Sequence, residues 1–234
     1  MTPNLTDEDR GKLQDARVVA SVSGGKDSAA LSLWLTEQGV EHDRIFADTG
    51  WEHPDTYEYL RGDLREKLGP IVEVQSEKGG LKEWVRHKGM FPTRMRRFCT
   101  EKLKVGPIKK HLGTYDVEIV NAVGVRGQES KARAKMARWE EWRQMDCEVW
   151  RPLIDWKEED VIDIHQRHAL APNPLYLRGA GVDRVGCWPC IFSRKKEIKQ
   201  VAELTPERIE EIRHLELEVQ GLATERYAAK GETF

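Results

Sequence analysis

Hydrophobic positions along the chain form short β-branched runs that alternate with stretches of helical periodicity. The clearest run is Arg17-Val-Val-Ala-Ser-Val-Ser23, which is followed at once by two glycines. Short buried runs of this kind are typical of strands, whereas the apolar positions of 27–38 recur at helical spacing. The same pattern predicts further strands at 44–48, 71–75, 117–123 and 148–153, and helices from Pro54 and over 80–88, 101–112, 157–168 and 206–229.

Alternation of strands and helices predicts an α/β fold with an open, mostly parallel, twisted sheet and helices on both faces. The sequence contains no internal repeat, no low-complexity tract and no linker-like segment. We therefore expect residues 1–234 to form a single domain. Its core should span about 17–170, and about 170–234 should form a cysteine-bearing loop region followed by a terminal charged helix.

Composition narrows the class of protein. The 234 residues are 39% hydrophobic and include eight Trp, five Tyr and five Phe, so a disordered chain is not expected. No apolar run approaches the ~18–20 residues of a membrane helix. The first ten residues are polar and acidic, unlike a signal or transit peptide. We expect a soluble cytoplasmic protein without a membrane partner.

Charge is balanced over the whole chain but segregated along it. Lys and Arg number 38 against 40 Asp and Glu, yet residues 82–110 hold ten basic residues and two acids. Residues 178–199 hold six basic residues and two acids. Basic blocks in a neutral protein predict a local anion site, able to hold a polyphosphate or the backbone of a nucleic-acid substrate.

Ser23-Gly24-Gly25-Lys26-Asp27-Ser28 joins the first expected strand to the first expected helix. Glycines at such a junction let backbone N–H groups converge on an anion, and the helix start adds free N–H groups and a positive dipole end. The hydroxyls of Ser23 and Ser28 can donate to phosphate, and Lys26 can neutralise its charge. Asp27 can cap the helix or help to hold Mg²⁺. The loop is not a Walker A loop, because G-x-x-x-x-G-K-[ST] is absent.

The loop is one of an ordered set of motifs. The others are Phe46-Ala-Asp-Thr-Gly50 with Pro54-Asp-Thr-Tyr57, Gly124-Val-Arg126 with Glu129, Ser130 and Arg133, and Arg151-Pro-Leu-Ile-Asp-Trp156. This set, over about residues 17–200, resembles the PP-loop proteins of the adenine-nucleotide α-hydrolase superfamily, and within them the phosphoadenosine phosphosulfate (PAPS) reductase family.

The resemblance implies a Rossmann-like PP-loop fold that binds an adenine nucleotide, either ATP with Mg²⁺ or a sulfonucleotide such as PAPS or adenylylsulfate. It implies that Asp48 and Gly50 lie beside the nucleotide, where an open α/β sheet places its ligands. It also implies that Arg126, after Gly124, reaches a phosphate or sulfate group. Lys26, Asp27 and Arg126 are therefore the candidate catalytic residues.

The four cysteines suggest a metal site in a reducing compartment, where structural disulfides are rare. Cys187 and Cys190 form a C-x-x-C pair that can reach one metal centre. Cys99 begins a segment similar to the C-C-x-x-x-K-x-x-P segment of iron–sulfur adenylylsulfate reductases, which have adjacent cysteines where this chain has Phe98-Cys99. Cys147 is the remaining candidate for a fourth ligand. We expect these four residues to hold a [4Fe–4S] cluster.

Two alternatives to that cluster stay open. Zinc suits the same four cysteines, or a set in which His165 or His168 replaces Cys147. The thiols can also be reduced and free of metal, with Cys147 a small buried apolar residue.

Three functions fit the motifs. The first is an ATP pyrophosphatase that forms AMP and pyrophosphate and activates a substrate, such as a nucleic acid, for sulfur transfer from a donor protein. DNA-phosphorothioation ATP pyrophosphatases resemble the chain in this respect. The second is a PAPS or adenylylsulfate reductase that works with a thioredoxin-like reductant and releases sulfite. Assimilatory PAPS reductases carry an E-C-G-[IL]-H tail, and this sequence has no cysteine after Cys190, so the first function is expected. The third is a non-catalytic nucleotide- or nucleic-acid-binding module with a structural metal site.

Overall fold

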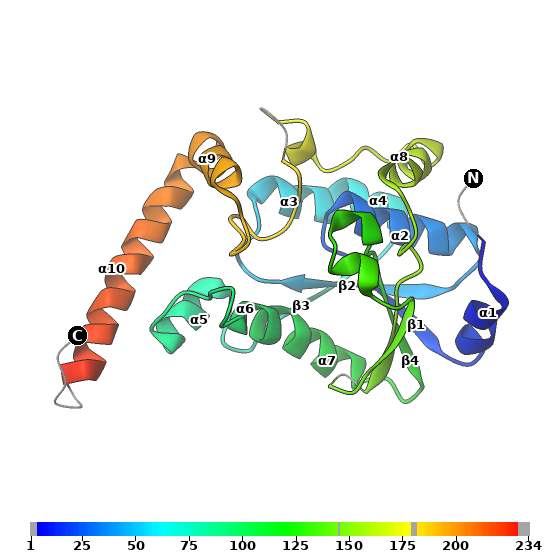
Figure 1. Ribbon diagram of the computed structural model, residues 1–234, viewed down its shortest axis with the longest axis horizontal. Helices are drawn as coiled ribbons and strands as arrows, with labels where there is room; N and C mark the ends of the chain where they lie inside the picture. Colours follow the sequence, from blue (N-terminus) through cyan, green and yellow to red (C-terminus); the bar gives the residue numbers. More distant parts are fainter. Residues whose placement is uncertain (1–3, 145, 179–181, 229–234) are drawn as a thin grey trace.

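A six-stranded sheet forms the centre of the computed structural model, which describes residues 4–144, 146–178 and 182–228 (Figure 1). The strand order is β3-β2-β1-β4-β6-β5, and every neighbouring pair is parallel except β5–β6. The strands are β1 (Arg17–Ser21), β2 (His42–Asp48), β3 (Val72–Gln75), β4 (Ile119–Val123), β5 (Trp139–Trp142) and β6 (Cys147–Trp150). The predicted α/β fold with a mostly parallel sheet is confirmed.

The β1 run is apolar on both sides because both faces of the sheet are covered. Val18 and Ala20 pack into one hydrophobic cluster with Trp34 of α2 (Lys26–Glu37), whereas Val19 packs into another with Leu112 of α7 (Gly106–Leu112). Alternate residues of one strand therefore anchor a helix on each face.

The helices form two layers, as Figure 1 shows, with α2, α3, α4 and α8 above the sheet in this view and α5, α6 and α7 below it. The upper layer contains α3 (Pro54–Tyr59), the π-helical turn η1 (Leu60–Leu64), α4 (Arg65–Leu68) and α8 (Glu158–Arg167) beside α2. The lower layer contains α5 (Leu81–Lys88), α6 (Phe98–Thr100), the π-helical turn η2 (Glu101–Val105) and α7.

Short 3₁₀ turns and two helices complete the chain. The turns are η3 (Gly127–Glu129), η4 (Arg133–Lys135) and η5 (Pro174–Tyr176), and the helices are α9 (Lys195–Leu204) and α10 (Pro206–Ala228). In Figure 1, α10 extends away from the sheet along the side of α5. None of the described helices is long and apolar enough to cross a membrane.

The hydrophobic pattern of the sequence did not predict three of the elements. The short helix α1 (Asp7–Leu13) begins at a capping box in which Thr6 and Asp9 exchange hydrogen bonds. The edge strand β5 pairs antiparallel with β6, although its sequence, Trp-Glu-Glu-Trp, lacks strict alternation. Helix α9 lies within the region expected to be loop-rich. That the whole chain forms one domain stays a prediction.

Sheet order also fixes where a ligand can sit. The chain runs from β1 outward through β2 to β3, then returns to place β4 on the other side of β1. This reversal opens a crevice at the carboxyl ends of β1 and β4, where open α/β sheets bind their ligands. The loops after β1 and β4 carry the two strongest sequence motifs.

Candidate functional site

The loop between β1 and α2 is held in a fixed shape by its own serines. The Ser28 hydroxyl donates to the Gly25 carbonyl oxygen at 2.9 Å and accepts from the Ser23 N–H at 3.1 Å. Gly25 is the N-cap of α2 and offers no capping side chain. Backbone N–H groups and the positive dipole end at the start of this 12-residue helix are therefore directed toward the crevice, as an anion site requires.

Two of the glycines are required by the backbone itself. Gly24 has φ of +73°, which L side chains rarely adopt, and a Cβ there would lie 2.8 Å from Thr56 Cγ2. A Cβ on Gly124, after β4, would lie 2.7 Å from the Asp27 carbonyl oxygen. Gly24 thus lets the loop after β1 lie against Thr56 of α3, and Gly124 lets the loop after β4 lie against the first turn of α2.

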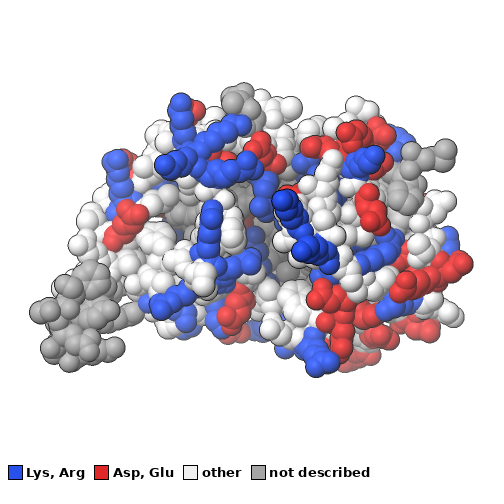
Figure 2. All heavy atoms as spheres, in the orientation of Figure 1, with Lys and Arg blue, Asp and Glu red and all other residues white. Residues whose placement is uncertain are grey.

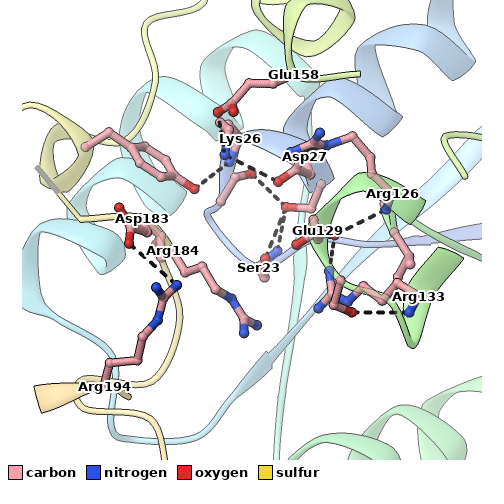
Figure 3. A pocket seen from close by; sticks show the side chains of 17 residues that line it. Ser23, Lys26, Asp27, Arg126, Glu129, Arg133, Glu158, Asp183, Arg184 and Arg194 are labelled. Atoms are coloured by element: carbon pink, nitrogen blue, oxygen red, sulfur yellow. Dashed lines mark hydrogen bonds and ion pairs between the residues drawn. The ribbon is translucent and has the colours of Figure 1, made fainter. Parts of the chain in front are cut away.

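A pocket of about 470 Å³ opens between these loops (Figure 3). Its lining includes Ser23, Gly25, Lys26, Asp27 and Ser28 from the first loop and Gly124 and Arg126 from the second. Seven residues that the motifs singled out for nucleotide binding therefore share one cavity.

Charged side chains inside this pocket form a connected network. Arg126, only 4% exposed, donates through Nε to Asp27 Oδ1. Lys26 Nζ lies 3.4 Å from Glu158 Oε1 and 3.7 Å from Asp27 Oδ2. Arg133 pairs with Glu129. Asp27 therefore positions both Lys26 and Arg126.

Arg184 differs from the other cations of the pocket. Figure 3 shows its side chain projecting into the cavity. Among the residues that the structure describes, none forms a hydrogen bond or ion pair with its guanidinium. This cation is therefore available to an anionic ligand.

Sequence reasoning missed a second set of residues that supports the loop from α8 and η5. The Tyr176 hydroxyl accepts from the Lys26 N–H at 3.2 Å, and the Asn173 amide donates to the Gly24 carbonyl oxygen at 3.1 Å. His165 Nε2 lies 2.9 Å from the Lys26 carbonyl oxygen. These contacts join residues about 140–150 positions apart in the chain. No local sequence signal marks them.

Asp48 and Gly50 lie at the carboxyl end of β2, as expected, but they are not among the lining residues of the pocket. Asp48 Oδ1 accepts from the Gly50 N–H at 2.8 Å and from the Tyr57 hydroxyl at 2.7 Å. In the structure this carboxylate therefore shapes the turn after β2, and a contact of Asp48 with the nucleotide stays a prediction.

A second pocket, of about 180 Å³, adjoins the first and shares Ser23, Arg184 and Val185 with it. Cys187 and Cys190 line it together with Lys104. Burial raises the pKa of the Cys187 thiol, an effect that Lys104 partly opposes. The C-x-x-C pair therefore lies next to the phosphate loop.

The structure does not bring the four cysteines together. Cys99 and Cys187 pack against the same apolar cluster around Trp51 and Trp84. Cys147 is the first residue of β6 and packs on the face covered by α7. Because β6 runs parallel to β4, this position lies at the opposite edge of the sheet from the phosphate loop. Cys147 is half-buried, and desolvation raises the pKa of its thiol to about 11.

Other ligand sets are also absent from the described part of the chain. In residues 4–144, 146–178 and 182–228, no group of three or more His, Cys, Asp or Glu side chains is placed to hold a metal ion. Both ring nitrogens of His165 face backbone carbonyl oxygens, and His168 Nε2 lies 2.8 Å from Glu37. The arrangement of these side chains does not fit the expected iron–sulfur cluster or its zinc alternative.

Comparison with known proteins decides the family. Residues 17–193 match the phosphoadenosine phosphosulfate reductase domain. The chain belongs to the PAPS reductase family. Among its relatives, a 37.8 kDa protein of Escherichia phage 186 is 34% identical, over 82% of this chain and 72% of its own length. A Methanocaldococcus jannaschii protein is 28% identical, over 84% of this chain.

Other relatives of this PAPS reductase family member carry named activities. An adenosine 5′-phosphosulfate reductase of Allochromatium vinosum is 30% identical, over 63% of this chain and 57% of its own. The chain spans 46% of the M. jannaschii relative, so it corresponds to less than half of that protein.

Solved structures show the same fold. PAPS reductase from Candida auris superposes with a TM-score of 0.57 and 17% identity, covering 80% of this chain and 98% of that one. The U34-tRNA thiolase NcsA from Methanococcus maripaludis, solved with a [4Fe–4S] cluster, gives a TM-score of 0.50 at 16% identity, covering 88% and 71%.

Proposed function

We propose that this PAPS reductase family member is an ATP pyrophosphatase that activates an acceptor for sulfur transfer. The observation that carries the proposal is the 470 Å³ pocket at the crevice between β1 and β4. It combines the start of α2 with the cations Lys26 and Arg126, and these groups can bind a polyphosphate and stabilise charge on a leaving pyrophosphate.

The proposed reaction has two displacements. An acceptor oxygen attacks the α-phosphorus, the bond to the β-phosphate oxygen breaks, and pyrophosphate leaves with the electron pair while the acceptor proton passes to solvent. A hydrosulfide ion delivered by a donor protein then attacks the acceptor atom that bears the adenylated oxygen, the bond between that atom and the oxygen breaks, and AMP leaves with the electron pair. With water as the acceptor, the products are AMP and pyrophosphate.

The pocket residues divide this work between them. The start of α2 and the Ser23 hydroxyl bind the β- and γ-phosphates, while the Ser28 hydroxyl holds the loop in shape through Gly25 and Ser23. Lys26 and Arg126 compensate the charge that develops on pyrophosphate, and Asp27 positions both cations. Asp27 and Glu158 supply carboxylate oxygens flanking Lys26, which fit Mg²⁺, an ion that binds proteins through one or two carboxylates and the substrate phosphates. Bound Mg²⁺ would neutralise phosphate charge.

A sulfonucleotide is the second candidate substrate, because some relatives are named adenosine 5′-phosphosulfate reductases. The same phosphate loop would hold the nucleotide, and a thiol with a thioredoxin-like reductant would release sulfite. The two candidates differ in their products, so one set of assays separates them.

The test measures AMP, pyrophosphate and sulfite formed from Mg·ATP and, separately, from adenylylsulfate with reduced thioredoxin. Lys26→Ala and Asp27→Asn should each lower pyrophosphate release from ATP by at least about 100-fold. Asp27→Asn is preferred to Asp27→Ala, because it keeps a hydrogen-bond acceptor for the buried Arg126 guanidinium. Lys67→Ala on α4, an exposed lysine outside the pocket, serves as the matched control. Wild-type turnover in both pocket variants, or sulfite release without pyrophosphate release, would contradict the proposal.

A further inference from the structure

Three segments of the chain carry cations and no acid. Residues 90–100, 130–135 and 184–196 hold ten Lys and Arg and neither Asp nor Glu, although acids outnumber bases in the whole sequence. We refer to the three segments together as the basic rim. Its cations are Arg94, Arg96, Arg97, Lys131, Arg133, Lys135, Arg184, Arg194, Lys195 and Lys196.

The rim segments meet at the nucleotide pocket. Ser130 and Arg133 of the second segment and Arg184 and Arg194 of the third line the pocket wall. The first segment reaches the third, because the guanidinium carbons of Arg97 and Arg94 lie 5.0 and 5.8 Å from the Phe192 ring centroid. Figure 2 shows Lys and Arg side chains gathered around a hollow in this face, with Asp and Glu concentrated toward the right-hand end.

Most of these cations have no acidic partner. In the described part of the chain, only Arg133 and Arg194 pair with acids, which are Glu129 and Asp183 outside the rim segments. Several cations elsewhere on the surface are paired with acids, as in Arg61–Glu73 and Lys82–Glu211. The rim therefore carries a concentrated and uncompensated positive charge that a polyanion would neutralise.

The rim also exposes apolar side chains between its charges. Met95 is 93% exposed and Phe192 is 38% exposed. Trp188, which lies within the third segment, is only 5% exposed and belongs to the core. Phe192 is the exposed aromatic ring among the described residues of the rim, and two arginines flank it.

We propose that the acceptor is a single-stranded nucleic acid, whose backbone lies on the basic rim and whose bases stack on Phe192. This inference deepens the proposed function and rests on it. Alternating cations and an exposed aromatic ring match a strand that presents phosphates and unpaired bases, which is how single-strand binders hold their ligand. A simple polyanion would gain nothing from Met95 and Phe192.

A single strand also fits the dimensions of the site. The reacting atom must reach the phosphate loop inside a 470 Å³ pocket, which already has to hold the nucleotide. A stacked and paired duplex cannot deliver one base or sugar into such a space without extruding it. An unpaired strand crossing the pocket mouth can do so directly.

Fluorescence anisotropy on the full chain tests the inference without nucleotide. The probes are a labelled 30-nucleotide single-stranded DNA, the same sequence as RNA, and its DNA duplex, with heparin as a competitor that lacks bases. A rim variant replaces Arg94, Arg97, Lys131 and Lys135 by Ala, none of which lines the pocket. The charge-matched control replaces the exposed Arg65, Lys67, Arg143 and Arg213, which lie outside the rim.

The expected result is single-strand binding that weakens with salt. The slope of log affinity against log salt should fall by about 3 in the rim variant, since each phosphate neutralised on a single strand contributes ~0.7. Phe192→Ala should weaken single-strand binding about tenfold and leave heparin binding unchanged. Tighter binding of DNA or of RNA identifies the acceptor within the proposed class.

Three results would overturn the inference: no single-strand binding by the wild type, duplex or heparin binding as tight as single-strand binding, or equal salt slopes in the rim and control variants. Pyrophosphate release from Mg·ATP is measured on the same preparations and should be unchanged in the rim variant. If the wild type releases pyrophosphate but binds no strand, the nucleic-acid acceptor is refuted and the proposed function is not. A wild type that binds strands but releases no pyrophosphate refutes the proposed function.

Discussion

Gly124→Ala is the substitution whose effect follows most directly from the packing of the two site loops. The added Cβ would lie 2.7 Å from the Asp27 carbonyl oxygen and 3.0 Å from Ser28 Cα. Both are backbone atoms of the first turn of α2, so no side-chain rotation relieves the contact. Because such atoms pack best at ~3.5 Å or more, the phosphate loop and the loop after β4 must separate by about 0.8 Å.

The free energy of unfolding and the rate of pyrophosphate release should both report that separation. Overpacking of this kind costs about 1–3 kcal/mol of the free energy of unfolding, which denaturant titration followed by tryptophan fluorescence detects. Displacing a binding loop by this distance should lower pyrophosphate release from Mg·ATP by about 100-fold.

A matched glycine gives the control for the same measurement. Gly11 lies within α1, where an added Cβ meets nothing within 4 Å. Gly11→Ala should leave turnover unchanged and stabilise the chain by up to about 1 kcal/mol, because alanine favours the helix. If Gly124→Ala unfolds and turns over like the wild type, the close approach of the two loops is not what builds the site.

Three further substitutions test other parts of the structure. Burial raises the pKa of Asp9, but hydrogen bonds from Arg138, Thr6 and Trp139 outweigh it and lower the pKa from 3.8 to about 2. Asp9→Asn should therefore lower the free energy of unfolding by about 2 kcal/mol at pH 7, and this loss should vanish as the pH falls from 3.8 through 2. Equal unfolding free energies at pH 7 would contradict this. Cys147→Ala should leave pyrophosphate release and iron content unchanged, because this thiol lies at the opposite edge of the sheet from the phosphate loop. A loss of bound iron in this variant would show that Cys147 is a metal ligand. Tyr176→Phe should cost about 1 kcal/mol of unfolding free energy by removing the acceptor for the Lys26 N–H, and an unchanged denaturation midpoint would refute that contact.

The parts of the fold that were predictable from sequence are those with strong local patterns. The β1 run is apolar at successive positions because both sheet faces are covered, and it leads directly into the glycine-rich loop. The resemblance implied that Arg126, after Gly124, reaches a phosphate or sulfate group, and both residues line the pocket beside the phosphate loop. The two loops meet because they directly follow the neighbouring strands β1 and β4.

Long-range packing accounts for most of what the sequence did not reveal. Tyr176 and Glu158 enter the pocket through contacts that span more than 130 residues, which no local spacing encodes. Cys147 had the residue type of a ligand, but the direction of β6 places it at the wrong edge of the sheet. Phe192 follows the C-x-x-C pair without a motif of its own, and its exposure depends on how the rim segments meet.

Competitive nucleotide binding tests the central claim most directly. Anaerobically purified protein is titrated with Mg·ATP, adenylylsulfate and PAPS, while iron, sulfide and zinc are measured on the same sample. The ATP pyrophosphatase account predicts that ATP binds most tightly and that AMP and pyrophosphate then form in equal amounts. Tighter binding of adenylylsulfate or PAPS, with sulfite as the product, would contradict it and identify the chain as a sulfonucleotide reductase.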